Sequence, residues 1–260
     1  MNAARPRGFT LIEILVVLAI VAVLAALLFG AMESVQGAGH SAHCVENLRQ
    51  LAAANILYAS ENNGQLVNAQ DRNNRLRWHG VRESISGPFR ADQGPLAPFL
   101  GTDRRVKLCP SLRSVLLGDA SFEDSTGGYG YNAIYVGGTP RDRFIAERLA
   151  NIPHPSRTIM FTDTAFARAN GIQEYPYCEP FKWVDAAGRL AGPLSASVHF
   201  RHQGHANVAW CDGHISAEIP SRIDFGNPYG GDSKKWQIGW FGPSAENGWW
   251  NTAADENAPR

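Results

Sequence analysis

Histidine and aspartate side chains near residue 200 are of the types that bind a metal ion. His202 is followed, after nine residues, by Asp212-Gly213, and His214 comes next. Asp163 follows a short apolar segment, and we expect it on a neighbouring strand. Zinc takes three or four nitrogen, sulfur or oxygen ligands, whereas calcium prefers oxygens. The sequence therefore offers a candidate site at His202, Asp212, His214 and Asp163, for zinc or, through the two carboxylates, for calcium.

A structural interpretation of these residues competes with the metal site. No HExxH or CxxC spacing fixes a set of ligands. In the structural interpretation His202 hydrogen-bonds a hairpin loop, Asp212 fills a preferred turn position and His214 faces solvent. The residues alone leave both interpretations open, so no cofactor is certain.

Cysteine is the other residue type here that carries chemistry. The chain has four, Cys44, Cys109, Cys178 and Cys211, and an even number suits a protein exported to an oxidising compartment. Three connectivities are possible. We favour Cys44–Cys109, which ties a helix to the following domain, and Cys178–Cys211, which ties a proline-rich loop to a hairpin. The alternative is that one or both pairs stay reduced.

The N-terminal region carries a third pattern. Residues 7–13 read RGFTLIE, and no residue from Ile14 to Met32 is charged. A secretory signal peptide has its cleavage site after the apolar core. Here the natural break, between Gly8 and Phe9, precedes it, so the apolar segment would stay on the mature protein. Glu13 is the lone acidic residue at the entrance to that segment.

This arrangement resembles the N-terminal signal of type IV pilins and type II secretion pseudopilins. The resemblance implies that prepilin peptidase cleaves between Gly8 and Phe9 and methylates the new amino group of Phe9. It also implies that Glu13 is the assembly glutamate, paired with the Phe9 amine of its own or a neighbouring subunit. The plainer alternative is that Glu13 only complements the helix dipole. The expected partners are prepilin peptidase, other pilin or pseudopilin subunits and the inner membrane.

The apolar segment has the length of a membrane span. At 1.5 Å per residue, residues 14–32 extend roughly 28 Å as a helix, close to the thickness of the hydrocarbon core. Arg5 and Arg7 precede the segment and favour a cytoplasmic N-terminus. We therefore expect a single-pass inner-membrane protein with a periplasmic head, either free in the membrane or within a filament.

Beyond the apolar segment, the helix is expected to continue to about residue 63. Apolar residues recur at three- and four-residue spacing, which predicts one buried face. They are Cys44, Leu48, Leu51, Ala52, Ile56 and Ala59. Asn63 and Gly64 suit a left-handed C-cap. The organisation is then a leader at 1–8, a helix at 9–63 and a head at 64–260, an α+β pilin-like lollipop whose loop-rich head is mainly antiparallel β.

The clearest strands of the head lie in residues 206–219, ANVAWCDGHISAEI. Asp-Gly between alternating segments predicts a hairpin with a two-residue type I′ loop, in which Cys211 faces His214 and Trp210 pairs with Ile215. Residues 157–161 predict a further strand, and 127–132 a strand or loop.

The His-x9-Asp-Gly spacing within residues 202–219 carries a second resemblance. It is similar to a C-terminal domain named for that spacing and found on many prepilin-processed proteins. Cys109-Pro110-Ser111 and the Gly-Tyr-Gly-Tyr-Asn segment at 128–132 agree with it. This resemblance implies a pseudopilin-like architecture and names no substrate.

Composition narrows the function. The chain has 24 basic and 24 acidic residues and no basic run, so nucleic acid is not expected as a partner. It also lacks GxSxG, zincin and phosphate-loop motifs. We therefore predict a non-enzymatic subunit of a pilus-like or pseudopilus-like assembly that polymerises through its apolar helix. The alternative is a membrane-anchored, metal-dependent hydrolase using the His/Asp cluster, or a ligand- or glycan-binding protein using the tryptophan-rich tail after Lys234.

Overall fold

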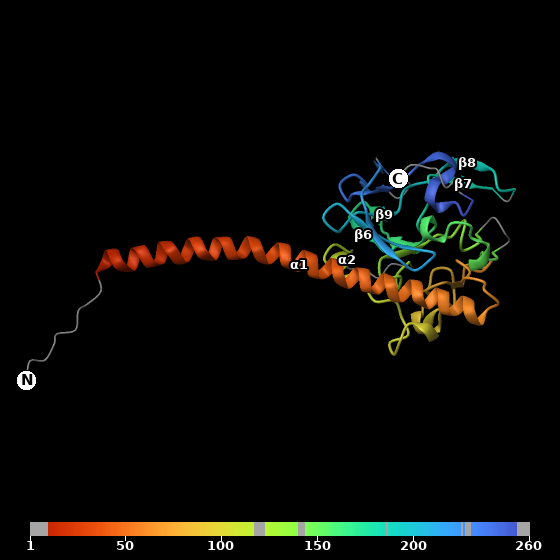
Figure 1. Cartoon of the computed structure of the whole chain (residues 1–260), viewed down its shortest axis with the longest axis horizontal. Helices are drawn as coiled ribbons and strands as arrows, with labels where there is room; N and C mark the ends of the chain where they lie inside the picture. The colour runs from red at the N-terminus through yellow and green to blue at the C-terminus, as the bar shows by residue number, and fades with distance from the viewer. Residues whose placement is uncertain are drawn as a thin grey trace, which may run out of the picture. The chain divides into compact units, whose positions relative to one another are not determined.

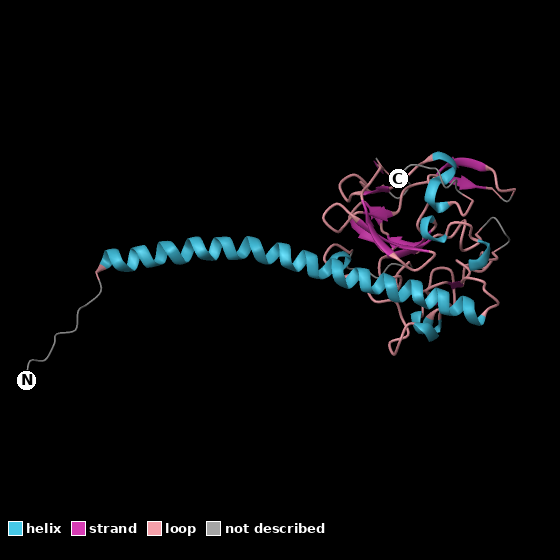
Figure 2. Ribbon diagram, in the orientation of Figure 1, coloured by secondary structure: helices cyan, strands magenta, loops and turns pink. Residues whose placement is uncertain are grey.

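The computed structural model describes residues 10–116, 123–139, 144–185, 187–224, 226 and 230–253; the side chains of 28–34 and 36 are not among those described. Gly8 and Phe9, the predicted cleavage site, lie outside the described residues. The fold is α+β, with one long helix and short, mainly antiparallel strands (Figure 2). The chain divides into two compact units, Met1–Gly39 and His40–Arg260.

Helix α1 (Leu11–Glu61) has 51 residues and contributes to both units (Figure 1). In the first unit its apolar side chains are exposed, for example Leu11 at 79% and Leu27 at 69%. The predicted span, residues 14–32, includes side chains outside the description. Of the residues that the structure describes, none form a helix with the length and hydropathy that a membrane crossing requires.

The second unit, His40–Arg260, is called the folded unit below. Its short helices are η1 (Ala91–Gln93), η2 (Ala97–Phe99), α2 (Pro110–Arg113), η3 (Leu149–Asn151), η4 (Pro155–Arg157) and η5 (Ala245–Trp250). Its main sheet contains β3 (Tyr129–Tyr131), β4 (Ile159–Asp163), β10 (Ala206–Trp210) and β11 (Ile215–Glu218). A second sheet contains β9 (Val198–His199), β12 (Arg222–Ile223) and β13 (Ile238–Trp240). Three two-stranded pairs are β1 (Leu76–Arg77) with β2 (Gly80–Val81), β5 (Phe166–Arg168) with β6 (Gly171–Gln173), and β7 (Lys182–Val184) with β8 (Leu190–Pro193).

The main sheet is antiparallel in the order β11-β10-β4-β3. The predicted strand at 157–161 begins two residues later, because Pro155–Arg157 forms η4. Every residue of β10 is buried, since the strand is central in the sheet. Neither face of β10 is therefore open to solvent.

The buried face of α1 packs beside β3. Cys44, Leu48 and Leu51 are fully buried. Asn55, which the apolar pattern did not single out, is also fully buried: its side chain donates to the Tyr131 hydroxyl at 3.3 Å and accepts the Val67 amide at 2.9 Å. Sequence periodicity thus found the face of the helix but not its polar anchor.

The C-cap of α1 has the predicted left-handed geometry. Asn63 has φ 54° and Gly64 has φ 79°, and the Gly64 amide donates to the Ala59 carbonyl at 2.8 Å. This cap turns the chain directly into the β-rich part of the folded unit.

The C-terminal tail packs its aromatic side chains into the core. Trp240, Phe241 and Trp250 are at most 1% exposed and Trp249 is 7% exposed, whereas Trp236 is half-buried. The side chain of Asn132 donates to the Trp250 carbonyl at 2.8 Å. Four of the five aromatic rings after Lys234 are therefore core residues.

The predicted hairpin is confirmed, but its predicted register was wrong. Ala209 pairs with Ile215 and Val208 with Ser216, one residue away from the expected pairs. The loop has three residues, because the Gly213 amide donates to the Trp210 carbonyl and Gly213 alone takes a positive φ, 90°. A type I′ loop needs positive φ at both central residues, and Asp212 does not have it.

The Gly213 geometry predicts a specific cost of substitution. A Cβ at Gly213 would meet only Ile56 Cδ1 at 3.5 Å, so Gly213→Ala costs stability through its backbone conformation, about 1–2 kcal/mol. Gly192→Ala is the matched control, because Gly192 lies on β8 with nothing within 4 Å of its Cβ position and without a positive φ. Urea denaturation followed by tryptophan fluorescence compares the two; equal stabilities would contradict the three-residue loop.

Candidate functional site

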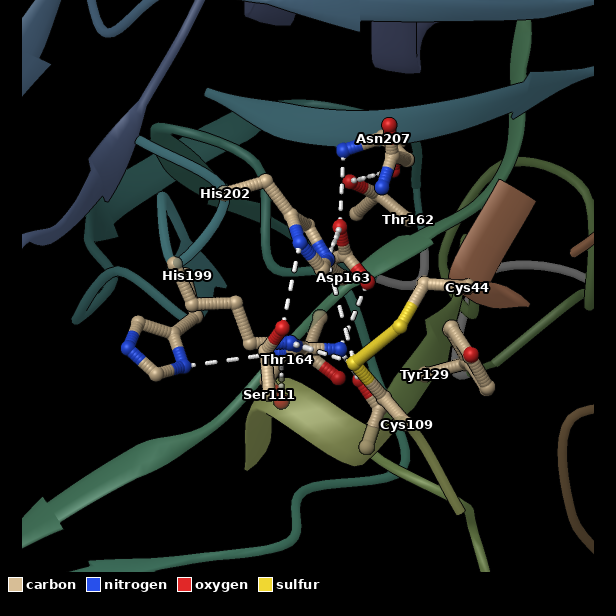
Figure 3. A network of polar contacts seen from close by, with 12 residues as sticks. Cys44, Cys109, Ser111, Tyr129, Thr162, Asp163, Thr164, His199, His202 and Asn207 are labelled. Atoms are coloured by element: carbon tan, nitrogen blue, oxygen red, sulfur yellow. Dashed lines mark hydrogen bonds and ion pairs between the residues drawn. A yellow bond between two sulfur atoms is a disulfide. The ribbon is translucent and has the colours of Figure 1, made fainter. Parts of the chain in front are cut away.

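A buried polar cluster of the folded unit surrounds Asp163, the last residue of β4 (Figure 3). Asp163 is fully buried. Its Oδ1 accepts a hydrogen bond from Arg201 Nη2 at 2.5 Å. Its Oδ2 accepts the backbone amide of Asn207 at 2.7 Å and lies 3.2 Å from His202 Nε2. Both carboxylate oxygens are therefore held by protein groups.

The charge of Asp163 is maintained despite its burial. Desolvation by itself would raise the pKa of the carboxyl group. The Arg201 guanidinium, His202 and the Asn207 amide act in the opposite direction and hold the pKa below its usual value. Asp163 is consequently an ionised group in the core.

Arg201 connects this carboxylate to three other segments. Its Nη2 donates to the Gly128 carbonyl at 2.7 Å, its Nη1 to the Thr164 carbonyl at 3.2 Å, and its Nε lies 3.3 Å from Cys109 Sγ. Gly128 has φ 82°, and a Cβ there would lie 2.2 Å from Leu112 Cδ2. Glycine at this position lets the loop before β3 approach the guanidinium.

His202 is placed by a tight turn. His202 and His205 exchange backbone hydrogen bonds of 3.0 Å in both directions, and Gln203 and Gly204 between them have φ 54° and 82°. The imidazole Nε2 lies 3.7 Å from Cys109 Sγ, and Nδ1 lies 3.5 Å from Ser111 Oγ. His202 is thus directed at Asp163 and Cys109 and not at the Asp212-Gly213 loop.

The predicted metal set does not come together. Asp212 and His214 form an exposed pair in the hairpin loop, with 2.6 Å between Oδ1 and Nδ1. His202 and Asp163 lie at the other end of β10, a five-residue strand that spans about 17 Å at 3.4 Å per residue. A single zinc site of all four residues, or a calcium site of Asp163 and Asp212, was therefore wrong. The spacing between His202 and Asp212 corresponds to strand β10 and the turn at each of its ends.

The cysteines divide into one bonded pair and two thiols. Cys44 of α1 is disulfide-bonded to Cys109, with 5.3 Å between the Cα atoms. Cys178 and Cys211 are buried free thiols, so the predicted Cys178–Cys211 disulfide was wrong. Cys178 donates its amide to Tyr131 beside β3, whereas Cys211 follows β10, so β3 and β4 lie between the two segments. Burial raises the pKa of both thiols.

At the start of α1, Thr10 and Glu13 form a reciprocal cap. Glu13 Oε2 accepts hydrogen bonds from the Thr10 amide and hydroxyl, both at 2.8 Å, and the Glu13 amide donates to Thr10 Oγ1 at 3.3 Å. This is a capping box. The Thr-x-x-Glu signal before an apolar segment was available in the sequence and was missed.

The comparisons with known proteins address this same N-terminal segment. Residues 4–29 match the family model described as Prokaryotic N-terminal methylation motif. The chain carries a prepilin-type methylation motif. The motif supports a type IV pilin-like or pseudopilin-like protein, in agreement with the resemblance drawn from residues 7–13. No curated protein and no solved structure matches the chain.

The Asp163–Arg201 pair predicts a large difference between two aspartate substitutions. Asp163→Asn leaves Arg201 charged and buried, so we expect a loss of about 3–5 kcal/mol in the free energy of unfolding. Asp185→Asn is the control: Asp185 pairs with Arg189, which is 80% exposed, and we expect a loss below about 1 kcal/mol. Urea titrations measure both, and similar losses would contradict a stabilising role for the buried pair.

Two buried histidines predict a pH dependence. Burial lowers the pKa of His199 to about 3, and burial with Arg77 and Arg82 nearby holds the pKa of His79 well below 6.5. Protonation therefore favours the unfolded chain. The stability that comes from keeping these two histidines neutral is fully present above pH 6.5 and is lost as the pH falls from 6.5 toward 3.

His79→Leu tests that dependence. No described residue hydrogen-bonds either ring nitrogen of His79, so the variant should be at least as stable at pH 7 and should lose less stability on acidification. Denaturation midpoints between pH 7 and pH 4 give the measurement, with exposed His40→Leu on α1 as the control. An unchanged slope in His79→Leu would refute the assignment.

Proposed function

We propose that this protein is a non-enzymatic, prepilin-processed subunit of a type IV pilus-like or type II secretion pseudopilus-like assembly. In this proposal prepilin peptidase cleaves between Gly8 and Phe9 and methylates the amino group of Phe9. The observation that carries the proposal is the methylation motif at residues 4–29. Because the proposed cleavage site precedes α1, the helix would remain on the product.

The first half of α1 supports polymerisation. Its described apolar side chains are exposed over successive turns, Ile14 at 48%, Val17 at 57% and Leu24 at 54% among them. Exposed apolar surface of this extent requires a bilayer or other copies of the same helix. We propose that residues 14–32 occupy the inner membrane before assembly and the interior of the filament after it.

Glu13 is the proposed assembly residue. Its carboxylate lies at the N-terminal end of α1, where it interacts with Thr10. Cleavage after Gly8 would create a charged amine at Phe9, next to Thr10 in the chain. An apolar environment makes an unpaired carboxylate costly, so pairing of Glu13 with the Phe9 amine of its own or a neighbouring subunit would favour incorporation into the assembly.

The folded unit supports an extracytoplasmic location and a structural role. The Cys44–Cys109 disulfide is typical of proteins in oxidising compartments. The groups around Asp163 bind one another, as expected of a cluster that stabilises the fold. We propose that residues 202–219 belong to the His-x9-Asp-Gly domain, with the spacing required by the strand between its two turns.

The processing proposal is tested by recovering the full chain from membranes of a host that carries prepilin peptidase. Intact mass and N-terminal sequencing should give a chain that starts at methylated Phe9, and Gly8→Val should abolish cleavage. Glu13→Ala should still be cleaved but should be lost from sheared filaments, while Glu46→Ala, an exposed glutamate on the same helix, should assemble normally. A chain that starts at Met1, or is cut beyond Met32, would overturn the proposal.

A further inference from the structure

Four side chains with metal-binding atoms converge where α1 meets α2 and the main sheet (Figure 3). The sulfurs of Cys44 and Cys109 and a ring nitrogen of His202 all lie within 4.8 Å of one another. His202 Nε2 also lies 3.2 Å from Asp163 Oδ2. Cys44, Cys109 and Asp163 are fully buried, and His202 is 7% exposed.

We propose that, in its dithiol form, the chain binds one zinc ion through Cys44, Cys109, His202 and Asp163. This site differs from the one expected from the sequence, because the cysteines replace Asp212 and His214. Two thiolates, one imidazole and one carboxylate make a tetrahedral ligand set, and such a set favours binding of zinc over calcium or magnesium. In the oxidised chain the sulfurs are bonded to each other, so the disulfide and the zinc ion exclude one another.

Two distances, from Cys109 to His202 and from His202 to Asp163, are close to those between ligands of a tetrahedral zinc ion. With zinc–sulfur bonds of about 2.3 Å and zinc–nitrogen or zinc–oxygen bonds of about 2.0–2.1 Å, neighbouring ligand atoms lie about 3.6 Å apart for sulfur and nitrogen and about 3.4 Å apart for nitrogen and oxygen. Cys109 Sγ and His202 Nε2 are 3.7 Å apart, and His202 Nε2 and Asp163 Oδ2 are 3.2 Å apart. Formation of the site also requires the two sulfurs to separate, by rotation of their side chains.

The groups behind these ligands are those that support zinc sites. Zinc-bound histidine commonly donates its second ring N–H to an oxygen, and ligating carboxylates are themselves hydrogen-bonded. Ser111 Oγ lies 3.5 Å from His202 Nδ1. Arg201 donates to the Asp163 oxygen that faces away from His202, and its Nε lies 3.3 Å from Cys109 Sγ.

Charge is balanced in both forms. In the disulfide form the buried Asp163 carboxylate is neutralised by Arg201. In the zinc form the two positive charges of the ion offset the two thiolates, while Arg201 still offsets Asp163. Net charge is expensive to bury, so the cluster can exchange a disulfide for a zinc ion at no cost in net charge.

The exchange is a balanced redox and acid–base reaction. A dithiol reductant transfers two electrons and two protons to the Cys44–Cys109 disulfide and becomes a disulfide itself. Zinc then displaces the two thiol protons and forms two zinc–sulfur bonds. Either state links α1 to Cys109. The zinc ion would provide this link in a reducing compartment, and the disulfide provides it in an oxidising one.

The test uses the full chain in detergent, reduced with dithiothreitol that is removed anaerobically before cobalt(II) is added. The expected result is one cobalt per chain with sulfur-to-cobalt charge-transfer absorption and tetrahedral ligand-field bands, displaced by zinc. The oxidised wild-type chain should take up none. His202→Gln should weaken binding at least about tenfold, and Cys44→Ser should abolish the charge-transfer signature of two thiolates.

A matched control is the double variant Cys178→Ser/Cys211→Ser, which removes the two free thiols and should leave cobalt binding unchanged. Circular dichroism checks the fold of each variant. If the Cys44 or His202 variants do not fold, reduced and oxidised wild type still decide the question. Absence of tetrahedral cobalt in the reduced wild-type chain, equal uptake by the oxidised chain, or loss of binding in the control variant would overturn the proposal.

Discussion

The buried ion pair between Asp163 and Arg201 joins several distant segments of the folded unit. A charge in the core is tolerated only when its partners replace the water that it lost. Those partners come from the loop before β3, the residue that follows β4 and the start of β10. Segments distant in the sequence are thereby fixed at one point, and misplacing any of them would leave a charge or a carbonyl unsatisfied.

The position of α1 on the folded unit follows from the same centre. The Cys44–Cys109 disulfide lies directly against Arg201 and His202. Further along the helix, Asn47 and Asn55 donate to the hydroxyls of Tyr129 and Tyr131, which are two residues apart on β3. The helix is therefore held by a covalent bond at one turn and by paired polar contacts over the next turns, with Leu48 and Leu51 buried between them.

Local patterns in the sequence predicted the parts of the fold that local chemistry controls. The C-cap of α1 at Asn63-Gly64 and the hairpin around Asp212-Gly213 were both predicted from their turn-forming residues. The hairpin register was missed because Asp-Gly suits a two- or a three-residue loop, and the choice depends on burial of both faces of β10. His202 and Asp163 were named together and do come together, but the pairing of Asp163 with Arg201 and the approach of Cys109 to His202 were not expected, because burial of a charge depends on contacts between distant segments. His202 and Asp212, ten residues apart, were expected to lie together, but the extended strand β10 separates them.

The reciprocal bonds between Thr10 and Glu13 have a consequence for maturation. Both residues lie on the C-terminal side of the Gly8–Phe9 bond, and the cap uses no atom from residues 1–9. The residues that form the N-terminal cap of the helix therefore belong to the mature chain and not to the leader. Removing the leader at that bond would change the charge at the end of the protein while leaving the three Thr10–Glu13 hydrogen bonds of the cap in place.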